Sequence, residues 1–71
     1  MTLAQNFRAN LRARVTDDPR SMRILADVSG YSASYIGRVM AGTMPNPTLL
    51  FVETMAATLN TTPTEMLRDP A

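Results

Sequence analysis

Hydrophobic residues recur at helical intervals along most of the chain, and short polar breaks divide them into five segments. The first segment carries an apolar residue at every fourth position, namely Leu3, Phe7, Leu11 and Val15. This interval predicts a helix with one apolar stripe toward the core. The helix is expected to end at the two aspartates before Pro19, because a residue that precedes proline avoids helical backbone angles.

A second, shorter helix is predicted from the residue after Ser21 to about Ser29. Ser21 is a suitable N-cap, since its hydroxyl can accept a hydrogen bond from the first turn. Gly30 favours the left-handed backbone angles that end a helix. The apolar positions of this helix are Ile24, Leu25 and Val28.

A third helix is predicted to begin after Ser32, to run through Ala41 and to end at Gly42. Only about three residues connect it to the second helix. So short a connection is unsuited to antiparallel helices lying side by side, and it indicates two helices that cross steeply, as in a helix-turn-helix. The residues expected on the core side of this third helix are Tyr35, Ile36 and Val39.

Two prolines in the run Thr43–Pro47 predict a loop, because proline cannot continue a helix. Thr48 is expected to cap a fourth helix, which runs to Leu59 with Asn60 at its end. The core stripe predicted for this helix consists of Leu49, Val52, Ala56 and Leu59, with Phe51 and Met55 at its edge.

The stretch Thr62–Glu65 has the order of a capping box with proline at the first helical position. It predicts a fifth, short helix to about Arg68. No segment has the alternating pattern of a strand. The sequence therefore predicts a compact all-α fold of five helices in a single domain, residues 1–71.

The composition removes most catalytic and metal-binding chemistry. The 71-residue chain has no cysteine and no histidine, so it lacks thiolate ligands and the commonest general base. We therefore predict no enzymatic activity, no metal and no cofactor, and no small-molecule ligand is evident. No apolar run approaches the roughly 20 residues that cross a bilayer. The first residues also lack the basic-then-apolar order of a signal peptide, which favours a cytoplasmic protein.

Charge is distributed unevenly along the chain, although the net charge is only +1. All seven basic residues are arginines, and six of them lie in residues 1–38, which carry a net charge of +3. Residues 39–71 carry a net charge of −2. This asymmetry is consistent with one face suited to an anion, and equally with a solvated surface that is asymmetric by chance.

Several small or apolar residues stand at defined intervals between Met22 and Met40, namely Leu25, Ala26, Gly30, Ile36 and Val39. In this order and spacing, the run resembles the helix-turn-helix of the Cro/cI-type (XRE-like) phage and bacterial repressors. The later runs Asn46–Leu49 and Glu65–Leu67, with Ala56 and Leu59, resemble the loop and last two helices of that family. The resemblance covers about residues 3–68 and implies a lambda-repressor-like DNA-binding domain.

The chain departs from the family pattern at three places. It has Met22 where the family often has a glutamine that touches a phosphate, and Ser29 where a leucine usually precedes the turn glycine. The loop after Gly42 is one residue longer than usual. Ser29 predicts a locally repacked core.

The outer face of the third helix is expected to be small, with one long donor. The resemblance implies that bases are read mainly from the positions of Ala33, Ser34, Gly37 and Arg38. The guanidinium of Arg38 can pair with guanine O6 and N7, whereas Ser34 can donate or accept. Ala33 offers a methyl contact to thymine, and Gly37 lets the backbone approach the DNA.

Contacts to DNA phosphates are expected from helix N-termini, arginines and the loop after the third helix. The candidate residues are Ser21, Ser32, Arg23, Arg20, Arg12, Tyr35, Thr43 and Asn46. Each residue also has an ordinary structural interpretation. The serines, Thr43 and Asn46 suit caps or turns, Tyr35 suits a partly buried core position, and the arginines suit a solvated surface.

The resemblance also implies a homodimer on double-stranded DNA. Leu50 lies off the predicted core stripe, and together with Met66 and Leu67 it is expected to form an apolar patch. The alternative is ordinary packing with one scattered surface leucine.

These features favour a sequence-specific transcriptional regulator, most like a Cro-type repressor that binds a pseudo-palindromic operator. A chain this short favours Cro-like proteins over those with an added oligomerisation domain, and a domain trimmed from a longer repressor would look the same. A second interpretation is a protein-interaction module, such as an antitoxin or adaptor. A third is a membrane-surface element in the first helix, which the burial expected for Leu3, Phe7 and Leu11 disfavours.

Overall fold

The computed structural model describes residues 2–44 and 46–70, and in these residues it contains helices and no strands. The helices are α1 (Leu3–Asp17), α2 (Met22–Ser29), α3 (Ala33–Ala41), α4 (Leu49–Thr58) and α5 (Pro63–Leu67). The all-α prediction and the order of the five helices are confirmed. Pro45, one of the two prolines behind the predicted loop, lies outside the described residues.

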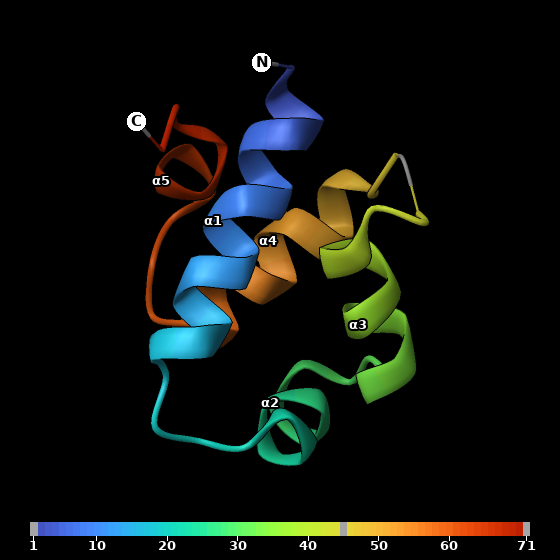
Figure 1. Cartoon of the computed structure of the whole chain (residues 1–71). Helices are drawn as coiled ribbons and strands as arrows, with labels where there is room; N and C mark the ends of the chain where they lie inside the picture. Colours follow the sequence, from blue (N-terminus) through green and yellow to red (C-terminus); the bar gives the residue numbers. More distant parts are fainter. Residues whose placement is uncertain (1, 45, 71) are drawn as a thin grey trace.

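The helices enclose one core, and the two ends of the chain lie at the same end of the molecule (Figure 1). In this view α1 crosses in front of α4, and α5 packs beside the first half of α1. Helices α2 and α3 form the lower and right-hand sides, joined by the three residues 30–32. The outer side of α3 is therefore turned away from both chain ends.

Every helix begins at a serine or threonine whose hydroxyl accepts a hydrogen bond from the backbone N–H three residues later. The caps are Thr2, Ser21, Ser32, Thr48 and Thr62, with donor–acceptor distances of 3.0–3.3 Å. The prediction of a reciprocal capping box at Thr62–Glu65 is wrong in its second half. Thr62 caps the helix, but the Glu65 carboxylate lies 3.4 Å from the Arg68 guanidinium instead of reaching back to Thr62. The complete box is at Thr2, whose N–H donates to the Gln5 side chain over 2.8 Å.

Gly30 and Gly42 end α2 and α3 with φ angles of +81° and +83°, as the sequence predicts. Ser29 also stabilises the turn between α2 and α3. Its hydroxyl donates to the Ala26 carbonyl and accepts from the Tyr31 N–H, both over 3.2 Å. The hydroxyl of the serine before the turn glycine therefore forms hydrogen bonds with the backbone of the turn. An apolar side chain at this position would have to pack against its neighbours instead.

The core is built mainly from α4 and the helices around it. The buried hydrophobic side chains are Phe7, Leu11, Leu25, Ile36, Val39, Phe51, Val52, Met55, Ala56, Leu59 and Met66. Two leucines predicted in core stripes are exposed, Leu3 by 64% and Leu49 by 78%. They are the first residues of their helices, where neighbouring helices do not cover them. Phe51 and Met55, predicted at the edge, are fully buried because α4 has neighbours on several sides.

Helix α2 buries less than its pattern predicts. Of its three apolar positions only Leu25 is buried, while Ile24 and Val28 are 47% and 59% exposed. The helix has only eight residues and turns a single narrow face to the core.

All four aromatic side chains of the chain meet in one cluster. The Phe51 ring lies edge-to-face against the rings of Tyr31, Tyr35 and Phe7, with centroids 4.8, 5.1 and 5.8 Å away. The Tyr31 and Tyr35 rings are stacked at 5.4 Å. The cluster therefore ties the start of α3 to α1 and α4.

An ion pair closes the turn after α1. The Asp18 carboxylate accepts hydrogen bonds from Arg20 Nε and Nη2 over 3.0 and 2.8 Å, and from the Arg20 backbone N–H over 2.8 Å. Arg20 Nη2 also donates to the Thr58 carbonyl at the end of α4, over 2.8 Å. We call these contacts the Asp18–Arg20 clamp. The hydrogen bonds from Arg20 lower the pKa of Asp18 from 3.8 to about 2.

The clamp makes stability depend on pH in the acid range. Because the pKa of Asp18 is lower in the folded state, its stabilisation is complete above about pH 4 and is lost as the pH falls toward 2. We expect Asp18→Asn to lower the melting temperature at pH 7 and to flatten its fall between pH 4 and pH 2. Asp17→Asn is the control, because Asp17 is exposed and its carboxylate forms no ion pair with any described residue. Equal pH curves for the parent and Asp18→Asn would contradict the clamp.

Candidate nucleic-acid interface

The outer side of α3 is small and open, as its pattern predicts. Ala33, Ser34 and Arg38 are exposed and Gly37 is half-buried, while Ile36 and Val39 on the opposite side are buried. The structure therefore brings the four predicted base-reading residues together on one helix face. Arg38 is the one long polar side chain among them.

Gly37 is not required by packing. A Cβ atom built at this position meets no other atom within 4 Å, and its φ angle is not positive. Glycine in a helix interior destabilises by about 0.5–1 kcal/mol relative to alanine. The backbone in the middle of α3 is thus uncovered at Gly37, and the fold itself does not require glycine at this position.

The N-termini of α2 and α3 flank this face. The exposed Ser21 and Ser32 hydroxyls accept from Ile24 and Tyr35 N–H groups, so both serines act as caps. The other first-turn N–H groups of each helix have no partner within the helix, because helix starts leave such donors free. They can bind an anion such as a phosphate.

The predicted phosphate-binding arginines divide into two groups. Arg23 and Arg12 are exposed, and neither forms an ion pair with any described residue. The Arg20 guanidinium is committed to the Asp18–Arg20 clamp. Nε and Nη2 of Arg20 thus have a structural role in the free protein, and its phosphate contact stays a prediction.

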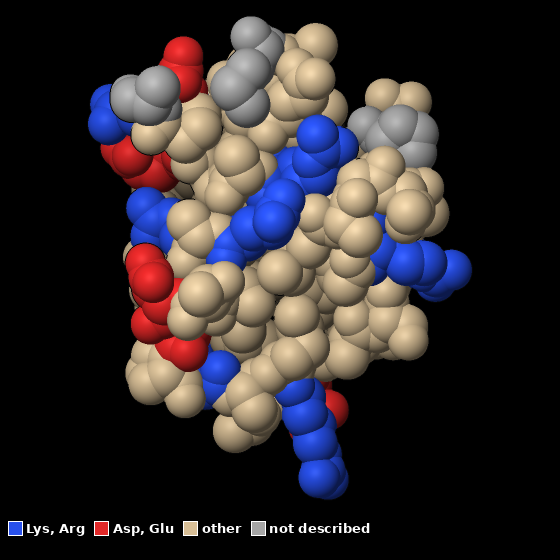
Figure 2. Space-filling view, viewed as in Figure 1, with Lys and Arg blue, Asp and Glu red and all other residues tan. Residues whose placement is uncertain are grey.

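In Figure 2 arginine side chains lie between α1 and α3, beside α3 and below α2. Acidic side chains gather on the opposite edge, beside α5 and the end of α1, where other arginines lie among them, and one is partly hidden near α2. In this view the surface beside α3 therefore carries arginines and no acidic side chain, whereas the opposite edge carries both signs of charge.

Two of the three remaining predicted contacts have structural roles in the free protein. The Thr43 hydroxyl donates to the Arg38 carbonyl over 3.1 Å, which caps the end of α3. The Tyr35 ring is half-buried in the aromatic cluster, which agrees with its structural interpretation. Asn46 is exposed in the loop before α4. The Tyr35 hydroxyl and the Asn46 amide can still donate outward, whereas the Thr43 hydroxyl can only accept there.

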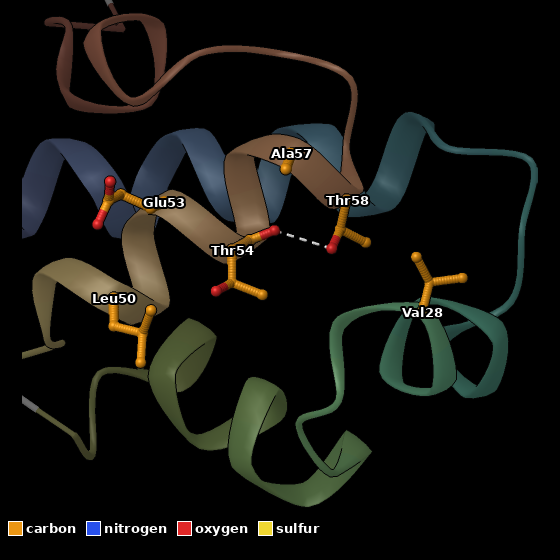
Figure 3. Close-up of a pocket in the computed structure, with 6 residues that line it drawn as sticks. All are labelled: Val28, Leu50, Glu53, Thr54, Ala57 and Thr58. Carbon is orange, nitrogen blue, oxygen red and sulfur yellow. Dashed lines mark hydrogen bonds between the residues drawn. The ribbon is translucent and has the colours of Figure 1, made fainter.

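The predicted apolar patch does not form as expected. Met66 is fully buried, because α5 packs this side chain against the core. Leu67 lies beside Leu3 and Leu49, at a small cavity between the starts of α1 and α4. Leu50 lies elsewhere, in an open groove between α2 and α4 (Figure 3), whose lining residues are Val28, Leu50, Glu53, Thr54, Ala57 and Thr58.

Sequence reasoning missed one arginine near α3. The Arg8 side chain extends from α1 and lies against Gly42, at the end of α3. Arg8 lies four residues before Arg12 and off the apolar stripe, which indicates that both arginines share one polar face of α1. The sequence of α1 alone does not show which other helix the Arg8 side chain reaches.

No protein-family model, curated protein or solved structure matches the chain. Within residues 2–44 and 46–70, no helix has the length and apolar character needed to cross a bilayer. The same residues contain no group of three or more acidic side chains placed to hold a metal ion.

Proposed function

We propose that the protein is a sequence-specific double-stranded DNA-binding regulator in which α2 and α3 act as a helix-turn-helix. The observation that carries the proposal is the outer face of α3, where small, exposed side chains surround one arginine. A helix that enters the major groove needs a slim face and a few side chains that reach base edges. The shape and the charge of this face favour the same ligand.

The α3 face suggests how bases are read. Arg38 donates in bidentate geometry to guanine O6 and N7, and the Ser34 hydroxyl exchanges one hydrogen bond with a neighbouring base. The Ala33 methyl contacts a thymine methyl. Gly37 has no side chain, so the α3 backbone can lie close to the groove floor.

Backbone contacts would orient α3 in the groove. The N-termini of α2 and α3, at Ser21 and Ser32, offer N–H groups to phosphates, and Arg23 and Arg12 supply positive charge. Because these contacts displace counterions, binding should weaken steeply with salt. With so few base-reading groups, we propose that the protein binds a pseudo-palindromic site as a homodimer and acts as a repressor.

Arg38→Ala tests the proposal directly. We expect this variant to bind a site selected from a random-sequence pool about 5–150 times more weakly for each half-site, corresponding to about 1–3 kcal/mol for each bidentate base contact that is lost. It should also lose the preference for guanine at one position of each half-site. Fluorescence-anisotropy titration at low and moderate salt measures both effects.

Arg68→Ala is the matched control, because Arg68 is an exposed arginine at the end of α5, away from α3. It should change affinity little and leave the base preference intact. If the parent protein shows no salt-sensitive binding to any duplex at low salt, DNA binding is ruled out as its function.

The groove between α2 and α4 favours a second candidate function, a protein-interaction module. Val28 and Leu50 are 59% and 65% exposed on either side of it, and Ala57 is also exposed (Figure 3). Exposed aliphatic residues along a groove are typical of protein-binding surfaces. A partner that binds there would leave the α3 face free, so the two functions can be separated by substitution.

A further inference from the structure

On the basis of the DNA-binding function proposed above, we propose that Arg8 binds a DNA phosphate at the C-terminal end of α3. The site consists of the Arg8 guanidinium beside Gly42, since both donors of the neighbouring Thr43 are already used by the Arg38 carbonyl. Arg8 comes from α1, so this contact would join a third helix to the DNA interface. Arg38 in the last turn of α3 is proposed to read a base, so Arg8 would be a separate cation for the phosphate at this end.

The Arg8 side chain lies against Gly42. A Cβ atom built on Gly42 would lie 2.7 Å from Arg8 Nη1, 3.3 Å from Cζ and 3.6 Å from Cδ. The guanidinium and the end of its aliphatic stem therefore lie directly over the Gly42 backbone. Since Gly42 also has a φ angle of +83°, glycine serves two purposes here, the helix end and the space for Arg8.

The charge of Arg8 is not neutralised within the described part of the protein. The ion pairs among the described residues join Arg20 to Asp18 and Arg68 to Glu65, and neither involves Arg8. No hydrogen bond from its guanidinium is formed to the described residues either. A half-buried cation with free donors gains more from an anion than a fully hydrated one does.

Two of the carbonyl groups at the end of α3 already have donors, and none of the described carbonyls accepts from Arg8. The Arg38 carbonyl accepts from the Thr43 N–H and hydroxyl, both over 3.1 Å, and the Val39 carbonyl accepts from the Gly42 N–H over 3.1 Å. The planar guanidinium of Arg8 is thus left to bind outward. Its geometry suits two oxygens of one phosphate.

The location suits a phosphate beside the groove. A helix in the major groove is bordered by both sugar-phosphate strands. Ser32 lies at the start of α3, and Arg8 lies at its end, so contacts at both ends would hold the helix in register. Figure 2 shows arginine side chains reaching across from α1 toward α3 on this side of the molecule.

Arg8→Gln tests this inference through the salt dependence of binding. We expect the slope of log K against log salt to fall by about 0.9 for each bound subunit, or about 1.8 for the proposed dimer, because each subunit of the variant neutralises one phosphate fewer. Affinity should decrease by the same factor for a selected site and for a random duplex, because a phosphate contact carries no base information. The full-length chain is titrated by fluorescence anisotropy at four or more salt concentrations.

Two further variants make the result specific. Arg14→Gln is the matched control on the same helix, because Arg14 lies beside Asp17, Asp18 and Leu59, away from α3. It should retain the parent slope. Arg8→Lys keeps the charge and should restore most of the slope, and thermal melting of each variant reports whether the fold is intact.

The possible outcomes separate this inference from the proposed function. If the parent binds DNA with a steep salt dependence and Arg8→Gln has the same slope, the Arg8 site is overturned while DNA binding stands. If the parent does not bind DNA, the proposed function fails first. Inorganic phosphate without DNA is the second probe, and saturation of the Gly42 amide shift by submillimolar phosphate would identify a free-phosphate site and overturn the assignment to DNA.

Discussion

Phe51→Ala is expected to remove a large share of the free energy of unfolding at 25 °C. Phe51 is fully buried, and its ring contacts the three other aromatic rings of the chain. Truncating a buried phenylalanine to alanine costs about 3–5 kcal/mol, through reduced apolar burial and the cavity that remains. At about 0.05–0.15 kcal/mol per residue, a chain of 71 residues has about 4–11 kcal/mol in total. One side chain thus accounts for much of the stability.

Urea denaturation followed by circular dichroism measures this loss. Phe51→Leu fills most of the cavity and should cost clearly less than Phe51→Ala. Leu50→Ala is the control from the adjacent position, since Leu50 is 65% exposed and its truncation should change the free energy of unfolding by less than about 0.5 kcal/mol. A loss below about 1 kcal/mol for Phe51→Ala would show that the aromatic cluster does not hold α3 as the geometry indicates.

The helix boundaries could be predicted because the signals that set them are local. A serine or threonine hydroxyl needs only the N–H three residues later, and a glycine at the helix end needs only its own φ angle. Ser21, Ser32 and Gly42 therefore act as the sequence indicates. The start of α1 follows the same rule, since Thr2 and Gln5 form an unpredicted capping box from residues of a single turn.

Which residues are buried depends on neighbours, and here the helical pattern alone was not sufficient. Leu49 and Phe51 both lie near the start of α4, yet Leu49 is exposed and Phe51 is central. The difference arises because Tyr31 and Tyr35, distant in sequence, pack on the side where Phe51 points. No periodicity within α4 contains that information.

The arginines show the same limit at the candidate site. Arg20 is predicted from the sequence to bind phosphate, but the fold places it between Asp18 and the end of α4. Arg8 is not predicted as a contact, but the fold places it at the end of α3. The sequence indicates how many cations the domain has. Which partner each arginine contacts depends on how α1 packs against α3. The α3 face could be predicted because all its members lie on one helix.

Gly37→Glu is expected to reduce DNA affinity by at least about 100-fold while leaving the protein folded. A carboxylate at this position would stand on the face that approaches the groove, where like-charge contact costs several kcal/mol. The fold has room for the side chain, because nothing lies within 4 Å of a Cβ atom at Gly37. Glutamate is also a better helix former than glycine, so thermal stability should rise.

Two matched variants decide what such a loss means. Gly37→Ala should increase stability by about 0.5–1 kcal/mol, and any fall in DNA affinity then measures the close approach of the α3 backbone. Ala57→Glu adds the same charge in the groove between α2 and α4 (Figure 3), and it should leave DNA affinity nearly unchanged. If Ala57→Glu abolished the binding of a protein partner while Gly37→Glu had no effect on DNA affinity, the interaction-module function would hold instead. The two faces differ in shape and charge, so one added carboxylate on each separates the two functions within one fold.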